Sequence, residues 1–152
     1  TSEYVNSWLN ASKHNIKYLK SERNKGKHFA LIDTIEHIKE GYVLIIDSDD
    51  LPNHNMLESF SKYINEYPGL SEYRARCTNQ NGEFLGRIKW LESDIYLTSW
   101  HELTLRKKFD EETISCFSLN YIKSVIKDFD RVIYLEDIKF INESIFWARN
   151  RK

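Results

Sequence analysis

The sequence predicts an α/β fold in which a mixed, mainly parallel sheet is flanked by helices. Residues 43–46 are four consecutive aliphatic residues between a glycine and a cluster of acids. Such a short apolar run is typical of a strand buried on both faces. Apolar stripes at helical spacing precede and follow it, at residues 29–38 and 56–64. Helices alternating with strands are the order expected of a parallel sheet.

The remaining elements are predicted in chain order from the same patterns. Asn81-Gly82 is a common two-residue hairpin turn, Ser118 is the expected cap of a late helix, and Gly41 is the glycine expected after the helix at 29–38. The expected helices lie at residues 3–12, 29–38, 56–64, 99–106, 118–127 and 143–150. The expected strands lie at residues 16–19, 43–46, 70–78, 83–86 and 113–117.

Composition excludes several classes of protein. The 152 residues include 22 basic and 23 acidic side chains, so the net charge of -1 offers no case for nucleic acid. Cys77 and Cys116 lie far apart, which argues against a disulfide framework or a zinc site. No apolar run approaches the roughly 20 residues of a membrane span. We expect one domain over residues 1–152, in the cytoplasm or at the inner face of the membrane.

An acidic cluster follows the strand at residues 43–46. Asp47, Asp49 and Asp50 fall at its carboxyl end, where ligands bind in open α/β sheets. Hard carboxylate oxygens that crowd together suit Mg²⁺ or Mn²⁺. The alternative is a solvated turn that caps the next helix through Asn53 or His54.

A basic turn precedes the helix at residues 29–38. It delivers Lys25, Gly26 and Lys27 to a helix N-terminus, a place suited to anions. The alternative is a basic turn that is only surface.

The order of these features resembles a known family. NKGKHFAL, a helix, YVLIIDSDDLPNHNMLESF, an NGE hairpin and FINESIFWARN together resemble family 2 glycosyltransferases of the GT-A type, from Thr1 to about Asn150. The resemblance implies a GT-A-like, Rossmann-like sheet. It also implies a partial domain without its first, nucleotide-binding strands, whose exposed sheet edge a second copy or the missing segment would cover.

The resemblance also implies a donor site. Asp47 and Asp49 correspond to the family's Asp-x-Asp motif, with Asp49 as the expected metal ligand and Asp47 directed at the ribose or the metal shell. Asn24, Gly26 and Lys27 match the loop that lies beside the donor.

Two acids compete for the family's catalytic base at the start of a late helix. Asp137 lies in a literal Glu-Asp pair, but no arginine follows at the expected distance. Glu143 departs from the literal motif, yet Trp147 and Arg149 follow as the family pattern requires. We favour Glu143; either acid could instead only complement a helix dipole.

The function implied is inverting transfer of a sugar from a nucleotide-diphosphate donor, with UDP as one candidate, to a glycan or lipid-linked hydroxyl in cell-surface polysaccharide synthesis. Two alternatives stay open. The chain could be an inactive fold fragment that binds a partner or a glycan. It could instead be a metal-dependent phosphoryl transferase in which Asp47 is the nucleophile, as in haloacid dehalogenase-like phosphatases.

Overall fold

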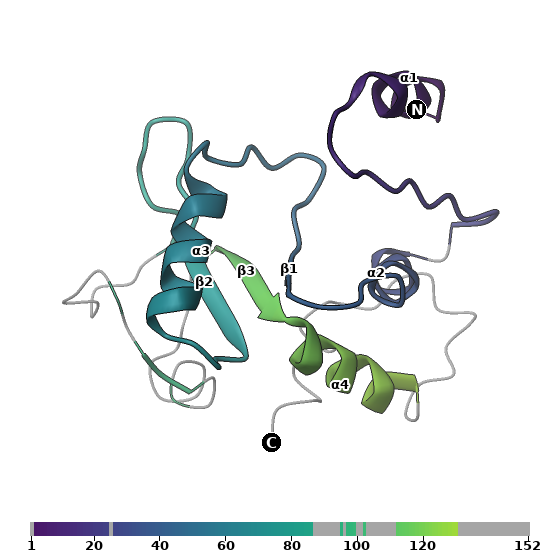
Figure 1. Cartoon of the computed structure of the whole chain (residues 1–152). Coiled ribbons are helices and arrows are strands. Elements are labelled where there is room, and N and C mark those ends of the chain that lie inside the picture. Colours follow the sequence, from purple (N-terminus) through teal and green to yellow (C-terminus); the bar gives the residue numbers. More distant parts are fainter. Residues whose placement is uncertain are drawn as a thin grey trace.

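The computed structural model describes residues 2–24, 26–86, 95, 97–99, 102 and 112–130 (Figure 1). Within these residues the chain forms a small mixed α/β fold. The helices are α1 (Ser2–Ala11), α2 (Lys27–Ile35), α3 (Met56–Glu66) and α4 (Leu119–Asp130). The strands are β1 (Tyr42–Leu44), β2 (Glu72–Arg76) and β3 (Thr113–Ser118).

The described strands form one sheet with the order β1-β3-β2. Both pairings are antiparallel, with Val43 opposite Phe117 and Tyr73 opposite Cys116. The prediction of mainly parallel pairing is therefore wrong for the described strands. β1 and β2 do run in the same direction, as two strands joined by a helix should, because each is antiparallel to β3. β3 lies between them and separates them. Because β3 is distant in the sequence from both strands, no local sequence pattern indicates that it pairs with them.

Each face of this sheet carries its own hydrophobic cluster, because successive residues of β3 point to opposite faces. Phe117 faces α2 and α4, whereas Cys116 faces α3. The first cluster consists of the buried residues Ile32, Ile35, Val43, Phe117, Leu119, Ile122, Val125 and Ile126. The second consists of the buried residues Phe60, Tyr73 and Cys116. The first cluster joins α2 to β1, so it sets where the start of α2 lies relative to the end of β1.

Several element boundaries differ from their predictions. α2 ends at Ile35, and Ile38 continues the apolar stripe from a turn in which its N–H bonds to the carbonyl of Ile35 at 3.1 Å. Gly41, with φ +100°, directly precedes β1 and does not cap α2. Residues 16–19 pair with no other described segment as a strand. The prediction for Ser118 is confirmed, since its Oγ accepts a hydrogen bond from the N–H of Tyr121 at 3.3 Å.

The hairpin after β2 is present, but its loop has three residues and not two. Thr78 and Phe84 form an antiparallel bridge, and the N–H of Asn79 bonds to the carbonyl of Glu83 at 2.9 Å. The N–H of Gly82 closes the turn with a hydrogen bond to the carbonyl of Asn79 at 3.0 Å. Gly82 has a φ of +82°. A turn followed by a left-handed glycine is the usual form of a three-residue hairpin loop.

Other predictions fall outside the described residues. These are the final helix at 143–150, most of the region 87–111 with its short helix, and both candidate bases, Asp137 and Glu143.

Candidate donor and metal site

The loop of residues 22–26, here called the basic loop, takes its shape from the backbone of its described residues; the predicted contribution of Lys25 lies outside them. The Oδ1 of Asn24 accepts a hydrogen bond from the N–H of Gly26 at 2.9 Å. Gly26 has φ 90° and ψ 165°, a region that is essentially open to glycine alone. α2 begins at the next residue, so Lys27 lies at the positive end of the helix dipole.

The loop of residues 47–55, here called the acidic loop, follows β1. It turns at once, since the N–H of Asp50 bonds to the carbonyl of Asp47 at 3.1 Å. Asp47, Asp49 and Asp50 are all exposed. The alternative of a solvated turn placed Asn53 or His54 at the N-cap of α3, but Asn55 occupies that position and makes no side-chain cap. Instead, Asn53 Oδ1 accepts a hydrogen bond from the N–H of Asn55 at 3.0 Å.

An ion pair between described residues connects the start of α2 to the acidic loop. Lys27 Nζ lies 2.5 Å from Asp47 Oδ1 and 2.7 Å from Asp47 Oδ2, although the residues are 20 positions apart. The two side chains are 40% and 47% exposed, and a pair this open contributes only about 0–1 kcal/mol. Packing of Ile32 and Ile35 with Val43, and not the ion pair, therefore holds the loops together.

The structure thus places the predicted donor-binding residues in two ways. It joins Lys27 and Asp47 directly, and it assigns Asn24 and Gly26 to the shape of the basic loop. Asp49 belongs to the same exposed loop, but no hydrogen bond or ion pair links its carboxylate to another side chain among the described residues.

Cys77 is a neighbour of the site that the sequence did not indicate. It directly follows β2, and burial raises the pKa of its thiol, with further contributions from the charges of Asp50 and Glu112. The common direction of β1 and β2 explains this proximity, because their carboxyl ends lie at the same edge of the sheet. The sequence does show that Cys77 follows a predicted strand. It could have indicated a place near the acidic loop only if the common direction of β1 and β2 had been known.

Asp47 and Asp49 have the oxygen ligands suited to a divalent ion whose coordination is completed by a bound phosphate group. Asp47 and Asp49 offer the oxygen donors that Mg²⁺ and Mn²⁺ prefer. Within the described residues, no three or more His, Cys, Asp and Glu side chains are grouped so as to hold a metal ion. One or two carboxylates completed by substrate phosphates and water are a usual set for Mg²⁺. The residues present therefore fit a metal bound together with phosphate.

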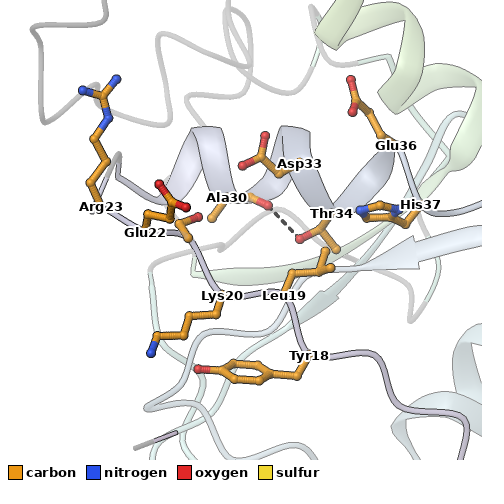
Figure 2. Close-up of a pocket in the computed structure, with 11 residues that line it drawn as sticks. Tyr18, Leu19, Lys20, Glu22, Arg23, Ala30, Asp33, Thr34, Glu36 and His37 are labelled. Atoms are coloured by element: carbon orange, nitrogen blue, oxygen red, sulfur yellow. Dashed lines mark hydrogen bonds between the residues drawn. The ribbon is translucent and has the colours of Figure 1, made fainter.

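A hollow of about 880 Å³ lies apart from these acids (Figure 2). It runs between residues 18–23 and the outer face of α2, where Thr34 Oγ1 donates a hydrogen bond to the carbonyl of Ala30 at 2.7 Å. None of the predicted site residues lines it, so it gives no support to the donor site.

Two acids follow a strand here, and one of them, Asp47, contacts Lys27 at the N-terminus of α2. The chain matches the family model described as Glycosyl transferase family 2 over residues 1–130, and it belongs to that family. The family implies a GT-A fold, a nucleotide-sugar donor and an acceptor, and its enzymes commonly use divalent metals. No curated protein and no solved structure matches the chain significantly.

The matched region includes both loops and ends before Asp137 and Glu143. The predicted resemblance to about Asn150 is thus supported as far as residue 130. Among the helices that the structure describes, none is both long and apolar enough to cross a membrane.

Proposed function

We propose that this protein transfers a sugar from a nucleotide-diphosphate donor to a hydroxyl acceptor with inversion, using Mg²⁺ or Mn²⁺ at Asp47 and Asp49. The observation that supports this most is the contact of Lys27 with Asp47, within a stretch that the family model matches. In this contact a cation at a helix N-terminus meets a carboxylate that follows a strand, and a helix N-terminus with a cation suits a diphosphate.

The residues of the chain would divide the work by charge. When bound, the metal would act as a Lewis acid for the charge that develops on the leaving diphosphate. Asp47 and Asp49 would hold it. Lys27 and the first turn of α2 would attract the diphosphate, while Asn24 and Gly26 keep the basic loop in the shape that presents them.

Glu143 is the proposed general base, and Asp137 is the alternative. A carboxylate at the acceptor would remove the proton of the attacking hydroxyl, a contribution of about 10²- to 10⁴-fold. Attack from the face opposite the leaving diphosphate inverts the anomeric carbon. Glu143→Gln should therefore lower turnover far more than Asp137→Asn, and the reverse ranking would move the assignment to Asp137.

The finer parts of the proposal concern the partners. We propose a UDP-linked donor, a glycan or lipid-linked acceptor, and a role in cell-surface polysaccharide synthesis at the inner face of the membrane. The outer edge of β1 is unpaired within the described sheet, which supports a second copy as a cover for that edge.

Calorimetry with UDP and Mn²⁺ tests the donor site. The chain should bind UDP only when Mn²⁺ is present, and Asp49→Ala should abolish that binding. Asp33→Ala is the matched control, because it removes a half-buried carboxylate that lines the hollow on α2, which none of the predicted site residues lines.

The alternatives predict different outcomes. Absence of binding at any Mn²⁺ concentration would favour a module that binds a partner or a glycan without turnover. A phosphorylated Asp47, trapped after incubation with a small phosphate donor and detected by mass spectrometry, would favour phosphoryl transfer.

A further inference from the structure

Both carboxylate oxygens of Asp47 face the same cation. Lys27 Nζ lies 2.5 Å from Oδ1 and 2.7 Å from Oδ2, and the described residues supply Asp47 with no other side-chain partner. A divalent ion at Asp47 would need at least one of these oxygens, and it would also repel the ammonium group at that distance. Lys27 and the metal therefore compete for Asp47.

Asp49 differs from Asp47 in this respect. Its exposed carboxylate has no ion pair or side-chain hydrogen bond within the described part of the chain, so a metal can reach it without displacing a protein cation. The two acids of the motif thus differ before any ligand binds. Lys27 neutralises the charge of Asp47, whereas the carboxylate of Asp49 is accessible to a metal ion.

Lys27 is well placed to exchange partners. Its backbone is fixed as the first residue of α2, whereas its side chain is 40% exposed. A lysine carries a point charge on a flexible four-carbon stem, and an exposed ion pair is weak enough to be broken at little cost. Because Lys27 is the first residue of α2, its side chain starts from a helix N-terminus, a feature that attracts anions.

We propose that Lys27 is a positioning residue that holds Asp47 in the ligand-free protein and transfers to the diphosphate when the donor binds with its metal. This inference rests on the proposed function and adds an exchange of ion pairs to it. Lys27 should therefore have opposite effects on two affinities. It should weaken binding of the metal alone and strengthen binding of the metal with the nucleotide.

The test measures two affinities of the full chain by calorimetry, for Mn²⁺ alone and for UDP at saturating Mn²⁺. Lys27→Gln should bind Mn²⁺ up to about fivefold more tightly, because it removes a competing exposed ion pair. The same variant should bind UDP about tenfold or more weakly, because it removes a charge-assisted contact to phosphate. Lys39→Gln, an exposed lysine between α2 and β1 that pairs with no described carboxylate, should change neither affinity.

Lys27→Arg separates charge from geometry. It keeps the cation, so Mn²⁺ affinity should stay near that of the unmodified chain, and UDP affinity should recover at least partly. Thermal melting of each variant checks that the fold is retained, and a folded Lys27→Gln is expected because an exposed ion pair contributes little to stability.

Two results would overturn the inference. If Lys27→Gln weakens Mn²⁺ and UDP binding together, the ion pair only supports the shape of the site. If both affinities stay unchanged, Lys27 touches neither ligand. In either case Asp49-dependent binding of UDP would still stand, whereas loss of that binding in the unmodified chain would remove the proposed function and this inference with it.

Discussion

The basic loop and the acidic loop reach the same site by different means. Each contains an asparagine whose Oδ1 accepts the N–H two residues later, at 2.9 Å for Asn24 and 3.0 Å for Asn53. The basic loop ends at Gly26, in a conformation that side chains oppose. The acidic loop instead presents exposed carboxylates on a plain turn.

The basic loop therefore contributes mainly through its backbone shape, and the acidic loop mainly through its side chains. The basic loop depends on a backbone conformation, which must be right before Lys27 can face Asp47. The acidic loop depends on which side chains it carries, since its turn needs only a backbone hydrogen bond from Asp50 to Asp47. Changes of the same kind should therefore have unequal effects in the two loops.

The largest effect should come from Gly26→Ala. At φ 90° and ψ 165° a Cβ is strained, and the expected loss is about 1–3 kcal/mol in the free energy of unfolding, measured by urea denaturation. UDP binding in the presence of Mn²⁺ should weaken as well, because the start of α2 would move.

Gly82→Ala is the matched control for Gly26→Ala. Gly82 also has a positive φ, +82°, but it lies in the hairpin loop with open space around the position of a Cβ. Gly82→Ala should lower the free energy of unfolding by about 1–2 kcal/mol and leave UDP binding unchanged. Equal losses of UDP binding in both variants would show that the shape of the basic loop has no special role.

Much of this comparison was predictable from sequence. Gly26 stands just before an apolar stripe, and the acids of the acidic loop stand just after an apolar run, so local patterns located both loops. The stripe of α3 and the cap at Ser118 were equally local. Long-range placement was not: nothing near Thr113–Ser118 reveals that this strand lies between β1 and β2.

Two local predictions failed for physical reasons. The apolar stripe of α2 ran on to Ile38, since this residue packs against the same cluster from a turn after the helix has ended. Residues 16–19 have the composition of a strand, but a strand needs a neighbour, and the described residues offer none beside this segment. Apolar spacing reports burial more directly than it reports hydrogen bonding.

A smaller effect should separate the two asparagines. Asn24→Ala and Asn53→Ala each remove one exposed turn hydrogen bond, so each should lower stability by about 0.5–1.5 kcal/mol in urea denaturation. Only Asn24→Ala should also weaken UDP binding, because only Asn24 holds the residue that precedes Lys27. A weaker affinity for UDP in Asn53→Ala and not in Asn24→Ala would reverse the distinction between the loops.

The smallest expected effect uses Cys77 as a reporter of charge in the acidic loop. Burial raises the pKa of this thiol most, and the negative charge of Asp50 raises it further, so less thiolate is present at pH 8 than for an ordinary cysteine. Asp50→Asn removes that charge, which should lower the pKa and speed alkylation by iodoacetamide by about twofold, since screening keeps such surface effects small.

Divalent ions should act on Cys77 in the same direction as Asp50→Asn. Mn²⁺ at the acidic loop adds positive charge near the thiol, so it should speed alkylation of the unmodified chain and have less effect in Asp49→Ala. Cys116 is the internal control, because burial raises the pKa of its thiol and no charge of the acidic loop contributes. Mass spectrometry follows both cysteines in one sample. If Mn²⁺ changes Cys116 as much as Cys77, the ion acts on the whole fold; if it changes Cys77 equally in Asp49→Ala, the acidic loop acts without Asp49.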